Sequence, residues 1–202
     1  MPKIVDHSQR REQIADVAID LLSERGLKGT TVRAVVAAAG LSSGAIRHYF
    51  TDHESLLRYA GEHLTERLRS RIRSLQFPEG LSAVDRACAL AQELLPLDRR
   101  RRGELIAYVE LASMDRGSGY WSDYRRMQHR NLRHLAHICV GLLTPKGTAV
   151  GEETRERLAR RVHWCIDGLS AQEVIYPEAV PPQEMTRFLR EVMEDVSAEL
   201  HR

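Results

Sequence analysis

The sequence has few cysteines, little net charge and no long apolar run. Cys88, Cys139 and Cys165 are an odd number and are scattered through segments with helical patterning. This usage provides no disulfide framework and favours reduced thiols in a cytosolic protein. The first residues, MPKIVDHSQRREQ, lack the apolar stretch of a secretion signal, and no uncharged run is long enough to span a bilayer. We therefore expect a soluble, cytoplasmic protein with no membrane partner.

The balance of charges gives little information about partners. A formal net charge of +2 is too small to indicate nucleic-acid binding by itself. The sequence also has no internal repeats, no β-rich runs and no low-complexity segments. Apolar residues instead recur at helical spacing along most of the 202 residues. The pattern predicts an all-α fold of about nine helices, and this length allows a small domain and a larger one.

No spacing of reactive residues marks a catalytic or metal centre. The sequence has no CxxC or HExxH motif, no nucleophile elbow and no phosphate-binding loop. A metal site can be imagined from His134, His137, Cys139, His163 and Cys165. Histidines in such a pattern more often occupy hydrogen-bonded or surface positions. We therefore predict no enzyme activity, no metal site and no cofactor.

Residues 30–57 have the features of two short helices joined by a tight turn. Thr31 has the side chain of an N-cap, and apolar residues follow at helical spacing until Gly40. Gly40 lacks a Cβ and permits the left-handed turn that ends a helix. Ser42 can accept a hydrogen bond from a following N–H group and so begin a second helix. Periodicity alone is equally compatible with a core helical hairpin and with a DNA-reading helix-turn-helix.

The second predicted helix has an apolar face and a polar face. Ile46 and Phe50 lie four residues apart and are predicted to pack inward. Small residues at the start of the helix let its N–H groups approach a phosphate. Arg47 can bind a guanine edge or a phosphate. The predicted outer face consists of Ser43, Gly44, Ala45, Arg47, His48 and Tyr49.

Residues 30–57 resemble the DNA-binding motif of the TetR family of transcriptional regulators. The family pattern is T-T-hydrophobic-x-x-I-A-x-x-A-G-V-S-x-G-x-L-Y-x-Y-F, followed by x-x-K-x-x-L-L. The matching residues are Thr30, Thr31, Val32, Val35, Val36, Ala39, Gly40, Leu41, Ser42, Gly44, Ile46, Tyr49, Phe50, Leu56 and Leu57. The resemblance implies a three-helix DNA-binding domain in residues 1–52 and a helical effector-binding and dimerisation domain in residues 53–202.

The sequence departs from the family pattern at two positions. Arg47 stands where the family usually has a tyrosine that contacts the DNA backbone, and Arg47 can keep that role. His53 stands where the family usually has a phosphate-binding lysine. Histidine is charged only part of the time near neutral pH, so this contact should weaken as the pH rises. The predicted DNA-binding residues are Thr31, Arg33, Ser42, Ser43, Gly44, Ala45, Arg47, His48, Tyr49 and His53.

Further helices are predicted before and after the motif. The first contains Ile14 to Leu22, with Asp6 or Ser8 as its cap, and ends at Gly26. The others are predicted at 54–75, 82–95, 104–114, 120–142, 158–169 and 185–200. The basic run at 99–102 lies between two amphipathic segments and is predicted to be a solvated loop.

A small-molecule effector is expected because bundles of helices can hold ligands between them and because the resemblance implies an effector. The candidate pocket residues are Tyr108, Met114, Trp121, Tyr124, Met127, His134 and Trp164. An individual aromatic or methionine residue in such a pattern is more often ordinary core than a ligand contact, and the family resemblance is what favours a pocket.

The last two predicted helices have wide apolar stripes, and TetR-like regulators form isologous dimers through such a pair. The candidate interface residues are Leu158, Val162, Cys165, Ile166, Leu169, Phe188, Leu189, Val192 and Val196. The resulting hypothesis is a homodimeric repressor that binds a near-palindromic operator in double-stranded DNA and is released by an effector. The alternative is a helical regulator that a protein partner controls or that has no effector.

Overall fold

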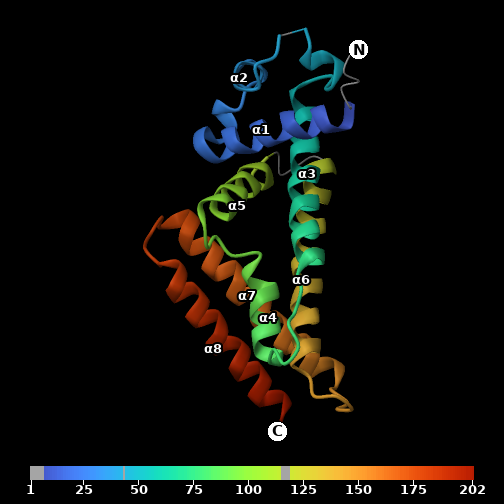
Figure 1. Cartoon of the computed structure of the whole chain (residues 1–202), viewed down its shortest axis with the longest axis vertical. Coiled ribbons are helices and arrows are strands. Elements are labelled where there is room, and N and C mark those ends of the chain that lie inside the picture. Colours follow the sequence, from blue (N-terminus) through green and yellow to red (C-terminus); the bar gives the residue numbers. More distant parts are fainter. Residues whose placement is uncertain (1–6, 43, 115–118) are drawn as a thin grey trace. The chain divides into compact units, whose positions relative to one another are not determined.

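The computed structural model describes residues 7–42, 44–114 and 119–202, and its regular structure is entirely helical in these residues (Figure 1). The predicted all-α fold is confirmed, with eight α-helices and one short 3-10 helix in the described ranges. None of these helices combines the length and the apolar character that crossing a bilayer requires. The elements are α1 (His7–Gly29), α2 (Val32–Ala38), η1 (Ile46–His48), α3 (His53–Ser74), α4 (Ala83–Gln92), α5 (Arg99–Ala112), α6 (Gly119–Leu143), α7 (Glu152–Ile175) and α8 (Pro182–Leu200).

The chain divides into two compact units, and neither is continuous in sequence. The first unit contains Met1–Ser70 and Gly103–Trp121, and the second contains Arg71–Arg102 and Ser122–Arg202. Helices α3, α5 and α6 contribute residues to both units. The functional boundary between residues 52 and 53 stays a prediction.

In the first unit, α1 presents an apolar stripe to the interior and packs against α2. Ile14, Ala18 and Leu22 are almost completely buried, as the helical spacing predicts. Gly26 has a φ of 64°, a left-handed conformation that L side chains rarely adopt. The regular helix therefore breaks at the predicted glycine, and one more turn follows. Of the two predicted caps, Ser8 lies inside α1 and Asp6 lies outside the described residues.

In the second unit, α8 packs against both α4 and α7 around an apolar core. Helix α4 begins at Ser82, whose hydroxyl accepts a hydrogen bond from the Asp85 N–H at 3.0 Å, as predicted. The core also contains Cys88 and Cys139. Burial raises the pKa of the Cys88 thiol to about 11 and that of Cys139 to about 12, so both thiols are protonated and poorly nucleophilic near neutral pH.

The basic run at 99–102 is not the predicted loop but the first turn of α5. The Asp98 carboxylate accepts a hydrogen bond from the Arg101 N–H at 2.8 Å and so caps the helix. The Arg102 guanidinium pairs at 2.6 Å with Glu173, which is buried. The basic run is therefore helical because Asp98 caps it and because Glu173, distant in sequence, pairs with Arg102. Its charge pattern alone favours a solvated loop.

Candidate nucleic-acid interface

The start of α2 is organised by Thr31, as predicted. Its hydroxyl accepts a hydrogen bond from the Ala34 N–H at 3.2 Å, and its backbone is extended, with φ −84° and ψ 158°. Val35 points into the core and is completely buried. Thr31 and Arg33 are exposed, so the first turn of α2 presents a hydroxyl and a guanidinium to solvent.

The second helix of the motif is shorter and tighter than predicted. The predicted α-helix after Ser42 is replaced, in the described residues, by 3-10 helix η1. The Ser42 hydroxyl does accept a hydrogen bond from the Ala45 N–H, at 3.2 Å, and so confirms the predicted cap. The segment between the cap and Phe50 is short, and Gly44 in it has low helix propensity. Both features reduce the stability of an α-helix here. Ser43 lies outside the described residues.

The two faces of the reading segment, which we define as residues 42–50, are distributed as predicted. Ile46 and Phe50 are 3% and 5% exposed and pack inward. Gly44, Arg47 and His48 are exposed, and Ala45 and Tyr49 are half-buried. The Tyr49 ring lies 4.7 Å from the ring of His7 on α1, centroid to centroid. The outer face is therefore accessible mainly at its small and cationic residues.

A groove of about 710 Å³ lies along α2 and the reading segment and has charged residues among its lining. Arg33 and Arg47 are exposed cations that can bind phosphates. Asp52 is the acid of the lining, and a hydrogen bond from the Ser55 N–H lowers the pKa of its carboxyl. The lining residues are Val32, Arg33, Val36, Ala37, Ile46, Arg47, Phe50, Thr51, Asp52 and Leu56.

His53 is the first residue of α3, and its imidazole is directed at the backbone before α2. Its Nε2 lies 2.6 Å from the Thr30 carbonyl oxygen, a geometry in which Nε2–H donates. That nitrogen is therefore engaged within the protein, and the side chain is half-buried. In the free chain, His53 Nε2 binds the Thr30 carbonyl, and the contact to a DNA phosphate stays a prediction. The spacing of the sequence motif does not indicate the hydrogen bond to Thr30.

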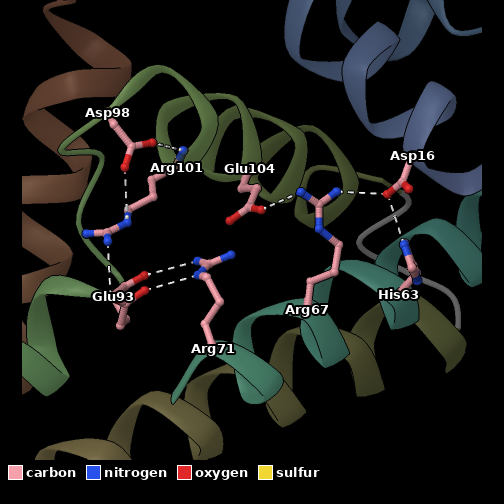
Figure 2. A network of polar contacts seen from close by, with 8 residues as sticks. All are labelled: Asp16, His63, Arg67, Arg71, Glu93, Asp98, Arg101 and Glu104. Atoms are coloured by element: carbon pink, nitrogen blue, oxygen red, sulfur yellow. Dashed lines mark hydrogen bonds and ion pairs between the residues drawn. The ribbon is translucent and has the colours of Figure 1, made fainter. Parts of the chain in front are cut away.

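Ion pairs join three helices of the first unit, as the close-up shows (Figure 2). Asp16 on α1 contacts His63 and Arg67 on α3, each at 2.9 Å. Arg67 also pairs at 2.9 Å with Glu104 on α5, which is buried. The shared Arg67 guanidinium therefore links α1, α3 and α5 to one another.

A second group of ion pairs in Figure 2 belongs to the other unit. Glu93 accepts from Arg71 on α3 and from Arg101 on α5, each at 3.0 Å. Arg101 also lies 3.3 Å from Asp98. Helix α5 is therefore held by charged contacts in both units.

Two family patterns match long parts of the chain. The pattern described as "Bacterial regulatory proteins, tetR family" matches residues 14–60, which contain α2 and the reading segment. The pattern described as "BetI-type transcriptional repressor, C-terminal" matches residues 83–198, more than half of the chain. The chain belongs to the TetR family of transcriptional regulators. It is accordingly a DNA-binding regulator and not an enzyme.

Curated transcriptional regulators match this TetR-family chain over most of their own length. The HTH-type transcriptional regulator PksA of Bacillus subtilis is 25% identical over 199 residues, which are 98% of this chain and 95% of the relative. The regulator BetI of Burkholderia thailandensis is 29% identical over 176 residues, 84% of each chain.

Solved structures share the fold of this TetR-family chain at lower identity. A transcriptional regulator from Rhodococcus sp. Rha1 has a TM-score of 0.78 at 24% identity, and the match covers 94% of this chain and 96% of that one. A regulator from Saccharomonospora viridis in complex with choline has a TM-score of 0.75 at 18% identity, with coverages of 93% and 96%. These likenesses establish the fold alone.

The candidate effector residues of this TetR-family regulator are distributed over both units. Trp121 and Tyr124 are buried, and Tyr108, Met114 and Met127 are half-buried. His134 is exposed on α6, and Trp164 on α7 is 66% exposed. The last two side chains are therefore exposed in the single chain, and the assignment of all seven residues to an effector pocket stays a prediction.

The candidate dimer residues lie mostly in the core of the single chain, and their place in a dimer interface stays a prediction. Cys165 is half-buried, and Phe188 is 48% exposed. The remainder pack inside because the most apolar stripes of α7 and α8 face each other and α4. The buried residues are Leu158, Val162, Ile166, Leu169, Leu189, Val192 and Val196.

Proposed function

We propose that this TetR-family regulator is a homodimeric repressor that binds a near-palindromic operator and is released by a small molecule. The observation that carries the DNA-binding part is the exposure of Arg33 and Arg47 along one groove of a TetR-type helix-turn-helix, with Thr31 exposed at the start of α2. Two such surfaces in a dimer, one helical repeat of DNA apart, would enter successive major grooves.

The proposed contacts differ in what they recognise. Arg33 and the Thr31 hydroxyl bind phosphates and set the register of the protein on the duplex. Arg47 binds a guanine edge or a phosphate, and Gly44 lets the backbone approach the groove. His48 and Tyr49 are further polar groups of the outer face that are available for contacts to DNA. His53 acts indirectly through Thr30.

The proposed dimer forms through the exposed sides of α7 and α8. Trp164, Ile175 and Phe188 are large apolar side chains that are 66%, 62% and 48% exposed, respectively. Large apolar side chains exposed on one helix pair favour contact with a second copy. These three residues replace the buried ones as the proposed core of the interface.

The proposed effector binds the helical part of the chain and lowers operator affinity by favouring one dimer conformation. A ligand can do this only by binding that conformation more tightly, and operator DNA and ligand then oppose each other. Tyr124 on α6 supplies buried aromatic surface, which suits an organic or cationic ligand. Choline is the first compound to test because one structural neighbour is in complex with it.

Selection of bound duplexes from a random-sequence pool tests the DNA-binding part. We expect one enriched near-palindrome and an affinity that falls steeply with salt. Titration of that duplex with choline and with a panel of small organic cations and anions then tests the release. Sequence-independent binding would contradict the proposal. An operator affinity that no compound changes would favour the regulator without an effector.

A further inference from the structure

The corner between α1 and α2 is held by a side chain from a distant part of the sequence. Glu110 on α5 accepts a hydrogen bond from the Leu27 N–H through Oε2 at 2.6 Å, across 83 residues of sequence. The preceding residue is Gly26, whose left-handed backbone turns the chain. A Cβ on Gly26 would lie 3.2 Å from the same carboxylate oxygen, so the carboxylate sits directly against the corner.

The other end of this corner is held by His53. The Thr30 hydroxyl donates to the Gly26 carbonyl at 2.9 Å, and the Thr30 carbonyl accepts from His53 Nε2 at 2.6 Å. Thr30 is completely buried. The next residue is Thr31, the N-cap of α2. Two side chains, one from α5 and one from α3, therefore fix the segment that leads into the first turn of α2.

We propose that Glu110 is a positioning residue for operator binding. Its carboxylate fixes the backbone at Gly26 and Leu27 and thereby orients Thr31 and Arg33 toward the DNA backbone. The inference rests on the proposed assignment of these two residues as phosphate contacts. Hydrogen bonds to charged groups are stronger than those between neutral groups, and this one is short and partly shielded from solvent.

The sign of the effect separates orientation from bulk charge. Glu110 carries a negative charge in the first unit, which also contains the proposed DNA contacts. If charge alone mattered, removing this carboxylate should strengthen binding to the negatively charged DNA. Loss of its positioning function should weaken binding instead. A weaker affinity in a variant that has lost this negative charge is therefore opposite to the electrostatic trend.

The first experiment measures the affinity of full-length variants for the duplex that the wild-type protein selects from a random pool. We expect Glu110→Ala to bind about tenfold more weakly, and Glu110→Gln, which keeps an acceptor oxygen, to lose less. Glu54→Gln is the control, because it removes the same charge from an exposed pair with Arg58 on α3. It should bind as tightly as the wild type or more tightly. Hydrogen exchange at Leu27 should accelerate in Glu110→Ala.

A double-mutant cycle with Arg33→Ala then tests whether Glu110 acts through the start of α2. If it does, Glu110→Ala should cost much less in the Arg33→Ala background, because the phosphate contact that it orients is already missing. Additive losses, or unchanged affinity of Glu110→Ala with accelerated exchange at Leu27, would overturn the inference. If Glu110→Ala does not fold, the same cycle is run with Glu110→Gln. A wild-type protein with no sequence-specific binding would instead remove the proposed function.

Discussion

At the scale of single residues, Arg47 is the exposed cation whose removal should lower the affinity for operator DNA most directly. Arg47→Ala should cost about 1–3 kcal/mol of operator binding and, if the guanidinium grips a phosphate, reduce the slope of log affinity against log salt by about 1. The measurement is a binding titration at several salt concentrations. Arg126→Ala is the matched control, because Arg126 is exposed on α6, away from the proposed interfaces, and pairs with Asp123 on the same helix. Equal effects of the two substitutions would remove Arg47 from the interface.

His163 should make the stability of the second unit depend on pH. Burial lowers the pKa of His163 below its ordinary value of 6.5; Asp167, at 3.2 Å, opposes the shift, and His129 adds to it. Below pH 6.5 the unfolded chain therefore binds a proton more readily than the folded protein does. The stabilisation that depends on this difference is complete above pH 6.5 and is lost as the pH falls toward the lowered pKa.

The corresponding variant is His163→Gln. We expect its free energy of unfolding to fall less steeply than that of the wild type between pH 7 and pH 5, as measured by denaturant titration at each pH. His201→Gln is the control, because His201 is exposed near the end of the chain. A pH slope in His163→Gln as steep as that of the wild type would show that the pKa of His163 does not differ between the folded and unfolded states.

At the scale of elements, η1 in the reading segment is the shortest helix in the described residues, and the segment around it supplies the proposed contacts to bases. A Cβ on Gly44 would meet nothing within 4 Å, so a side chain there points into open space. Gly44→Glu should therefore keep the fold and the dimer but lose operator binding by several kcal/mol, because an anion would face phosphates. Gly141→Glu, at an exposed position of α6 that is equally open, is the matched control. Operator binding retained by Gly44→Glu would contradict the docking.

The elements that sequence alone predicts are those whose cause is local. The caps at Thr31, Ser42 and Ser82 and the break at Gly26 each depend on one side chain or one missing Cβ, and all four are found. The first turn of α5 was missed because Arg102 finds its partner far away in the sequence. The bond from Leu27 to Glu110 likewise has no local signature.

Burial is harder to assign than helicity, and the candidate sites show why. A wide apolar stripe predicts that one side of α7 or α8 avoids water, but it does not say whether the cover is α4 or a second copy. Leu158 and Val196 proved to be core, while Phe188 is exposed. His134 and Trp164 similarly lie on the outer surface of the chain, because aromatic and histidine side chains occur on both sides of amphipathic helices.

At the scale of the whole molecule, dimer formation should depend on the exposed side of the C-terminal helices. Phe188→Glu should raise the dimer dissociation constant at least about tenfold, because it places a charge in an apolar contact. Operator binding should weaken in parallel. Sedimentation velocity over a range of concentrations measures the first effect. Phe77→Glu is the control, because Phe77 is 39% exposed and lies outside the helices. Equal dissociation constants for Phe188→Glu and wild type would place the interface elsewhere.

The Gly26 corner also bears on how regulators of this kind can be recombined. The carboxylate that holds it comes from Gly103–Trp121, which belongs to the same unit as the N-terminal residues despite the long intervening sequence. A chimera spliced after the helix-turn-helix would take its DNA-binding residues from one parent and the residue at the position of Glu110 from the other. Successful grafts should therefore transplant α5 together with the N-terminal segment, or choose a recipient with an acidic side chain at the equivalent place.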